Sequence, residues 1–578
     1  MTGDDDLHVQ LGRVRSRRAP RARTFIAQAL AAAERAGGTK RRSGRTERGG
    51  DFGRGRAASV AAVRRLGHRS RVVVIKSRVA RFKGRLTALK AHLGYLRRDG
   101  VSQDGSAGRT FDAERDDADH LAFAERCDGD RHHFRFIVSP DDADRLSDLK
   151  AFTRELMQQA ERDLGTKLDW VGIDHWNTEH PHVHVIMRGK ADDGRDLVIG
   201  REYISAGLRA RAEHLVTQEL GPRSDLEIRR GLDAQVHADR WTRLDRVLAA
   251  EAARHGQIVD LRPGTEQPVE GHVRSVLIGR MRKLEYLGLA EPLGPVQWRL
   301  SEDAEPTLRS LGERTDIIKR IHQGLAEQRI ERSMAQYALD ENAARRLTGR
   351  LVARGLNEEL QGTAFAVIDG VDGRVHHVCL PDLDAVSDAN LGGIVELRQY
   401  EDVAGRARIG LAVRSDLPLA AQVNARGATW LDRQLVGRTP AELSAGGFGG
   451  EVRLAMEGRI DHLVGERLAR RQGPRVVFAR DLLETLRQRD LDTKAAEIGS
   501  STGLRHYPVQ EGDVVAGTYR RRLDLASGRF AMMDDGLGFS LVPWSPSLER
   551  HLGQELSGTV RAGRVEWSFA RSRGLEIS

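Results

Sequence analysis

Four histidines fall within ten residues in the first half of the chain, in the string His175-Trp-Asn-Thr-Glu-His-Pro-His-Val-His184. The 578 residues contain 20 histidines in all, so chance does not explain this density. If the end of the string is a β-strand, His182 and His184 project from one face, roughly 7 Å apart, because side chains alternate along a strand. Two imidazoles at that separation can share a divalent metal ion.

A metal held by His182 and His184 needs a third ligand, and the preceding turn offers His175 and Glu179. Both can fold back over the same face. A carboxylate suits Mg²⁺ better than an imidazole does, which favours Glu179. Two solvent-facing strand histidines are the alternative to a metal site, but His175, Glu179 and His180 nearby argue against it.

A compact α+β domain over about residues 70–240 must position these groups. Runs of β-branched and apolar residues predict strands at 71–76, 133–138, 168–173 and 182–188. Hydrophobic residues at three- and four-residue spacing predict helices from Val79 to Leu96, from Leu146 to Leu164 and at about 201–219. Neighbouring strands can pair antiparallel.

A second pattern follows this domain. Apolar residues at helical spacing over 273–289, a Pro-Leu-Gly-Pro turn and a strand at 296–300 are typical of a winged helix. Four cationic residues would lie on the exposed side of that helix and could contact phosphates: Arg274, Arg280, Arg282 and Lys283. Winged helices also serve as packing modules, so the pattern alone does not decide between the two uses.

The chain therefore divides into five predicted segments. They are a basic, mostly disordered arm (1–70) with a possible short helix at 25–36, the α+β domain (71–240), a winged-helix-like domain (250–312), a helical linker (313–360) and a β-rich C-terminal domain (361–578). Within the last, we expect helices at about 440–492 and strands at 364–368, 375–380, 394–397, 514–522, 529–533, 538–542 and 558–569. No pattern in this domain indicates a catalytic site, and we expect it to be a scaffold or a domain that docks a partner.

Composition restricts the classes of protein that need considering. With 39% hydrophobic residues, no run of eighteen apolar residues and no hydrophobic signal segment, we expect a soluble, cytoplasmic protein without membrane insertion. The two cysteines match no metal-ligand spacing, so a metal would use histidines and carboxylates. The formal charge of +10 is uneven: residues 1–90 hold 24 Lys and Arg against 6 Asp and Glu. A basic block of this kind favours a nucleic acid partner.

The histidine string resembles motif III of the mobilisation relaxases, the HUH endonucleases that nick plasmid DNA for conjugation. The family pattern commonly reads HxDxxHPHxH, so Asn177 departs from a usual Asp, and Arg188 stands where an Asn often follows. The family also has an upstream tyrosine, often in a YLxRxG context, and this chain has Tyr95-Leu-Arg-Arg-Asp-Gly. The resemblance covers about 70–240 and implies an HUH palm, an antiparallel sheet with helices, in a conjugative relaxase of the type that includes the T-DNA border nickase.

The resemblance implies a site- and strand-specific nickase that acts at an origin of transfer. The Tyr95 hydroxyl would attack the scissile phosphorus, giving a 5′-phosphotyrosine and a free 3′-hydroxyl, and bound Mg²⁺ or Mn²⁺ would polarise the phosphate. Arg97 and Arg98, beside the tyrosine, would contact DNA. The implied partners are single-stranded and duplex DNA, accessory mobilisation proteins and a type IV secretion coupling protein. Several such relaxases carry a long C-terminal region of unclear role.

Two other functions fit parts of the sequence. The segment from His180 to Ile186 also fits the HφHφHφφ pattern of histidine-triad nucleotide hydrolases, with His182 as nucleophile and no metal. Such enzymes need neither the basic arm nor the tyrosine motif. A non-enzymatic winged-helix DNA-binding protein would leave the histidine cluster unexplained. Rolling-circle replication initiators and transposases share the metal–tyrosine chemistry but usually place the tyrosine after the histidine pair.

Overall fold

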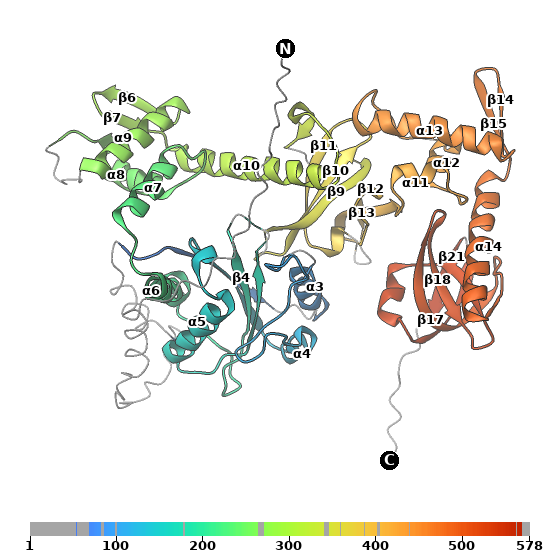
Figure 1. Cartoon of the computed structure of the whole chain (residues 1–578), viewed down its shortest axis with the longest axis horizontal. Helices are drawn as coiled ribbons and strands as arrows, with labels where there is room; N and C mark the ends of the chain where they lie inside the picture. Colours follow the sequence, from blue (N-terminus) through green and yellow to red (C-terminus); the bar gives the residue numbers. More distant parts are fainter. Residues whose placement is uncertain are drawn as a thin grey trace, which may run out of the picture. The chain divides into compact units, whose positions relative to one another are not determined.

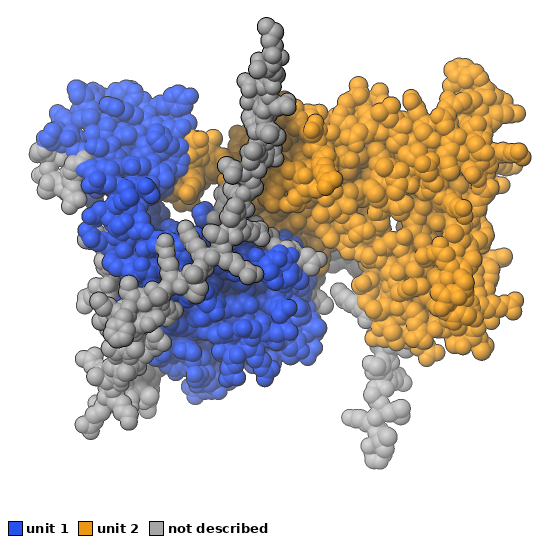
Figure 2. Space-filling view, in the orientation of Figure 1, with its two compact units in different colours: residues 1–238, 242–302 blue, residues 239–241, 303–578 orange. Residues whose placement is uncertain are grey.

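The structure is a computed structural model that describes residues 54, 69–81, 86–98, 101–176, 178, 180–263, 271–339, 346–358, 360–386, 388–401, 405–438, 440–561 and 563–568 (Figure 1). The basic arm predicted for 1–70, with its helix at 25–36, lies outside these residues apart from Arg54, Arg69 and Ser70, and so do Asn177 and Glu179. Two compact units divide the chain: residues 1–238 with 242–302, and residues 239–241 with 303–578 (Figure 2).

A four-stranded antiparallel sheet forms the centre of the first unit, in the order β1-β2-β4-β3. Its strands are β1 (Val73–Arg81), β2 (His132–Pro140), β3 (Trp170–His175) and β4 (His182–Arg188). The helices α5 (Leu149–Leu164) and α6 (Leu208–Leu220) lie on one side of the sheet and α3 (Leu86–Leu96) and α4 (His120–Arg126) on the other (Figure 1). A π-helical turn, Tyr203–Gly207, precedes α6.

Alternation along β4 decides which side chains enter the core. Val183, Val185 and Met187 are buried in the hydrophobic cluster that α5 and α6 complete. His182 and His184 therefore face the other side of the sheet, as the sequence predicts. The expectation that Val79 begins a helix is wrong, because β1 continues to Arg81 in register with all of β2.

The first unit also contains a helical module with a hairpin. Its elements are α7 (Asp225–Val236), α8 (Arg243–Arg254), β5 (Ile258–Asp260), α9 (Gly271–Tyr286), β6 (Ala290–Gly294) and β7 (Gln297–Leu300). The predicted helix and hairpin are thus present, and β5 adds a third strand beside β7.

The second unit opens with the long helix α10 (Ala304–Glu327) and a six-stranded sheet ordered β13-β12-β9-β10-β11-β8. The strands are β8 (Tyr337–Ala338), β9 (Leu347–Glu358), β10 (Thr363–Gly370), β11 (Val375–Leu380), β12 (Ile394–Glu401) and β13 (Ala407–Ser415). The helical linker expected over 313–360 is wrong after Glu327, because β9 occupies its end. Leu347 and Leu351 are four residues apart, a spacing that places two side chains on one face of a strand as well as of a helix.

Three helices, a hairpin and a fourth helix follow: α11 (Leu419–Val423), α12 (Trp430–Val436), α13 (Gly447–Gly465), β14 (Ala469–Gln472), β15 (Arg475–Phe478) and α14 (Leu482–Thr502). A second six-stranded sheet, ordered β16-β19-β18-β17-β20-β21, ends the described chain. Its strands are β16 (Arg505–His506), β17 (Val514–Leu525), β18 (Gly528–Asp534), β19 (Gly538–Pro543), β20 (Glu555–Arg561) and β21 (Arg564–Ser568). The single strand expected at 558–569 is two strands, because Gly563, at φ +70°, turns the chain back.

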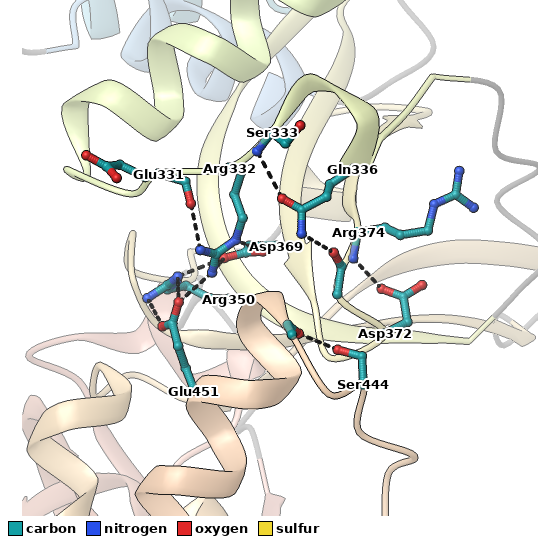
Figure 3. Close-up of polar contacts among 12 residues, drawn as sticks. Glu331, Arg332, Ser333, Gln336, Arg350, Asp369, Asp372, Arg374, Ser444 and Glu451 are labelled. Atoms are coloured by element: carbon teal, nitrogen blue, oxygen red, sulfur yellow. Dashed lines mark hydrogen bonds and ion pairs between the residues drawn. The ribbon is translucent and has the colours of Figure 1, made fainter.

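A network of ion pairs joins the first six-stranded sheet to α13 (Figure 3). Asp369 is 0% exposed and accepts from Arg332 and Arg350 at 2.8 and 2.7 Å. Glu451 of α13 pairs with the same two arginines at 2.5 and 3.1 Å. The four side chains balance their charges, which offsets the cost of burying Asp369.

The predicted class of α+β protein with a β-rich C-terminal region is confirmed at this level of detail. Among the described residues, every helix is too short or too polar to cross a lipid bilayer.

Candidate metal centre

Strand pairing brings three histidines together on the face of the sheet opposite α5 and α6. His175, the last residue of β3, lies directly across from His182, and His184 follows two residues along β4. One nitrogen of each ring lies within 4.8 Å of the other two. The Nε2 atoms of His182 and His184 are 3.2 Å apart. Three ligand atoms at these separations can hold one metal ion.

Backbone carbonyls fix the orientation of two of the three rings. Nδ1 of His182 lies 2.9 Å from the His180 carbonyl oxygen, and Nε2 of His175 lies 2.8 Å from that of Leu96. A carbonyl oxygen only accepts, so these two nitrogens carry the protons. Nε2 of His182 and Nδ1 of His175 are left with lone pairs. This pattern, with one ring nitrogen bonded to a carbonyl and a lone pair on the other, is typical of metal-binding histidines.

Nδ1 of His175 is buried and has no hydrogen-bond partner. Buried polar atoms are almost always paired, so an unpartnered lone pair on a ring that lies next to two other imidazoles points to a missing ligand. The residues therefore fit a metal ion bound by three nitrogens.

Burial keeps His175 and His184 neutral. Burial, together with the charge of Arg98, lowers the pKa of His175 to about 3. Burial also holds the pKa of His184 well below its usual value, with the neighbouring His175 and His182 adding to the effect. Neutral imidazole is the form that binds metals, so His175 and His184 can bind an ion without first losing a proton.

The helix that carries Tyr95 ends at this cluster. The Leu96 carbonyl that accepts from His175 belongs to the last residue of α3, next to the half-buried Tyr95. The guanidinium of Arg98 lies 4.5 Å from the centre of the Tyr95 ring, and its Nη1 is buried without a hydrogen-bond partner. Nη1 of Arg97 lies 2.8 Å from Nδ1 of His120. The structure thus gathers His175, His182, His184, Tyr95 and Arg98 in one region, while Glu179 lies outside the described residues.

The four cations predicted to contact DNA from α9 have different surroundings. Arg282 is exposed, Lys283 lies 5.4 Å from the centre of the exposed Tyr286 ring, and Arg274 donates to the Leu261 carbonyl. The expectation that Arg280 faces solvent is wrong. Its side chain is 0% exposed and pairs with Asp245 at 2.7 Å, so it is a structural residue of the module.

Three further polar residues, which were not predicted from the sequence, lie near the cluster. Arg135 of β2 shares the sheet face of His184, and its Nε donates to Nε2 of His133. His92 of α3 is buried, and burial together with Arg135 and His133 holds its pKa well below the usual value. Two patterns could have revealed them: alternation along β2, and the three-residue spacing of His92 and Tyr95 on one helix face.

One comparison with known proteins gave a match. A family model described as "Protein of unknown function (DUF3363)" matches residues 277–407 and 398–576, which together exceed half of the chain. Searches of curated proteins and of solved structures found no match. The matched residues exclude Tyr95 and the three histidines, so the family assignment says nothing of the candidate metal centre. The chain belongs to the DUF3363 family of proteins of unknown function.

Proposed function

We propose that this protein is a relaxase, a site- and strand-specific DNA nickase that acts at an origin of transfer during conjugative mobilisation. One observation carries the proposal: one nitrogen from each ring of a buried histidine triad lies within 4.8 Å of the other two, beside the helix end that bears Tyr95. The four-stranded antiparallel sheet, with two of these histidines on an inner strand, would be the HUH palm.

His175, His182 and His184 would hold a divalent ion, Mn²⁺ or Mg²⁺, that polarises the scissile phosphate when bound. The hydroxyl of Tyr95 attacks phosphorus, and the bond to the 3′-oxygen breaks. The products are a 5′-phosphotyrosyl enzyme and a free 3′-hydroxyl. Because one phosphodiester replaces another, the 3′-hydroxyl can later attack the adduct and reseal the strand.

Arg98 supports this assignment. Its buried Nη1 has no hydrogen-bond partner, and its charge acts on His175 and His184. A guanidinium so placed can donate to a non-bridging phosphate oxygen and offset its charge. The partners that follow are single-stranded DNA in the site, duplex DNA beside it, accessory mobilisation proteins and a type IV secretion coupling protein.

The test is incubation of the full chain with single-stranded oligonucleotides that tile the DNA flanking its own gene, with Mn²⁺, with Mg²⁺ or with EDTA. We expect one oligonucleotide to be cleaved at one position, with the 5′-end of its 3′ fragment attached to the protein. Cleavage in EDTA would refute the metal role. Release of free nucleotides without an adduct would support a histidine-triad hydrolase instead.

A further inference from the structure

The two six-stranded sheets of the second unit have the same topology. In each, a two-residue strand pairs parallel with the fourth strand (β8 with β11, β16 with β19), and the remaining pairs are antiparallel. In each, a twelve-residue strand (β9 or β17) lies between the third and fifth strands of its sheet. A 3₁₀ turn separates the fourth and fifth strands in both sheets. Six strands with one order and one set of directions indicate a repeat.

The helices that precede each sheet repeat as well. Thr242 and Thr429 cap α8 and α12, each in a capping box closed by the aspartate three residues later. Arg280 of α9 and Arg459 of α13 are both 0% exposed and form bidentate pairs with those aspartates, Asp245 and Asp432. Each arginine also donates to backbone carbonyls: Arg280 to those of Val236 and Ala238, and Arg459 to those of Val423, Ala425 and Gly427.

The turns after α9 and α13 match too. Gly288 and Arg467 take left-handed conformations, with φ of 73° and 61°. The next amide bonds back to the helix in both, Leu289 to Leu284 and Leu468 to Leu463. A hairpin and a long helix follow each turn. Apart from β5, the order of α-helices and strands over residues 236–415 is therefore repeated over residues 423–568. We call these two stretches the first and second copies.

The hairpins of the two copies differ in charge on the face that meets solvent. In the first copy, Glu291 and Arg299 are paired across the hairpin and form an ion pair at 3.1 Å. In the second, Arg470 takes the place of Glu291, directly after the alanine that begins the hairpin. Residues 467–480 hold five arginines and no Asp or Glu, whereas the equivalent 288–301 hold one Arg and one Glu.

Hairpin register shows which of these arginines lie on the face that meets solvent. Phe478 and Val476 pack on the hydrophobic cluster of Leu463 and Leu468, so the alternate residues face solvent. Arg470 and Arg475 lie on that outer face and are exposed. Arg471 instead pairs with Asp461 of α13, which fixes the hairpin to the helix.

Arg467 adds a third exposed cation at a position where its backbone is unfavourable. Left-handed φ suits glycine, which the first copy has there, and strains a residue with a Cβ. The second copy thus bears a strained backbone and gains a charge beside the hairpin. Within the described part of the chain, Arg467, Arg470 and Arg475 make no ion pair, so the surface has no internal anion.

We infer that the outer face of hairpin β14–β15, with Arg467, Arg470 and Arg475, binds the phosphate backbone of duplex DNA. A two-stranded ribbon is narrow enough to enter a major groove about 12 Å wide, with its arginines against the flanking phosphates. The surface has no aromatic side chain on which single-stranded bases could stack, which favours duplex over single strands. The inference does not depend on the nickase activity.

The test measures the full chain binding to a fluorescein-labelled random-sequence duplex of about 30 base pairs by anisotropy over a range of salt. We expect the variant R467G/R470Q/R475Q to lower the slope of log K against log salt by about one per arginine, roughly three in all. The matched control R520Q/R561Q/R564Q removes three exposed arginines from the second sheet and should leave the slope near the wild-type value. The charge-retaining variant R470K/R475K should also keep it.

An unchanged slope in the first variant, an equal fall in the control, or a loss confined to single-stranded DNA would each overturn the inference. Thermal unfolding of each variant shows whether it folds, and R470K/R475K tests the surface with its charge intact. Nicking of a cleavable oligonucleotide should survive all three variants. If the wild type nicks no oligonucleotide, duplex binding can still be measured. Failure of the nickase proposal is therefore distinguishable from failure of this inference.

Discussion

Nε2 of His175 lies 2.8 Å from the carbonyl oxygen of Leu96, the residue that follows Tyr95 in α3. This contact joins the end of β3 to the end of the helix that bears the proposed nucleophile. It also holds the proton on Nε2, which leaves the lone pair of His175 on Nδ1. A single hydrogen bond thus couples the position of the tyrosine to the geometry of the triad.

The structure places His175 beside His182 and His184, and we predict that His175 is the third ligand. We expect His175→Ala to lower Mn²⁺ affinity by at least about 100-fold, since even the loss of a residue that only orients a ligand costs 10 to 100-fold. Glu179→Gln should change the affinity much less. Calorimetric titration of both variants measures this. A larger loss of Mn²⁺ affinity in Glu179→Gln would instead identify Glu179 as the third ligand, as the sequence favours.

The ligand set also predicts which metal binds. Three imidazole nitrogens suit Mn²⁺ and later transition metals better than Mg²⁺, which prefers oxygen ligands and keeps its waters. We expect Mn²⁺ to support nicking at lower concentration than Mg²⁺. Rates measured over a titration of each ion would show it, and equal half-saturation would contradict the three-nitrogen set.

The sequence predicted the strand histidines because their spacing alone sets their face. It could not choose the third ligand, since His175 reaches the site through the pairing of β3 with β4 rather than through a local turn. Arg280 was misplaced for a similar reason. Its burial depends on Asp245, 35 residues earlier, and helical periodicity gives no information about a partner so far away in the sequence. The repeat was not predicted from the sequence because the two copies share few residues besides the Thr-x-Leu-Asp-Arg string.

The buried ion pairs predict a stability effect that a DNA contact would not produce. Arg280→Met leaves Asp245 buried and unpaired, which should cost about 3 to 5 kcal/mol of local stability. The equivalent Arg459→Met should behave alike in the second copy. Hydrogen exchange of α8 and α12 amides measures the loss. If amide protection were unchanged in Arg280→Met and the salt dependence of DNA binding fell by about one, Arg280 would instead be a residue that contacts DNA.

The metal-free protein should lose stability in acid through the triad. The folded pKa of His175, about 3, lies below its unfolded value of 6.5, so the unfolded chain binds more protons between these limits. The contribution of His175 to the free energy of unfolding is therefore complete above pH 6.5 and decreases as the pH drops toward 3. We expect the thermal midpoint of EDTA-treated protein to follow this course, and His175→Gln, which cannot be protonated, to show a shallower fall. Identical pH profiles would contradict the buried neutral state.

The nucleophile is tested by removing one oxygen atom. Tyr95→Phe keeps the ring that packs beneath the Arg98 guanidinium, so the fold and oligonucleotide binding should change little. Nicking and the covalent adduct should both disappear, because only the hydroxyl can form the phosphotyrosyl bond. The readout is a shift of the protein on a denaturing gel that survives boiling.

Two other tyrosines serve as controls for this assignment. Tyr203 is 2% exposed and its hydroxyl donates to Asp163 at 2.9 Å, so it has no access to a DNA strand. Tyr286 is 82% exposed on α9, and Tyr286→Phe is therefore the matched control that should retain the adduct. Mapping of the adduct peptide to Tyr286 would keep the reaction class and refute Tyr95. A phosphohistidine that acid destroys, unaffected by Tyr95→Phe, would instead assign the chemistry to His182 and make the enzyme a histidine-triad hydrolase.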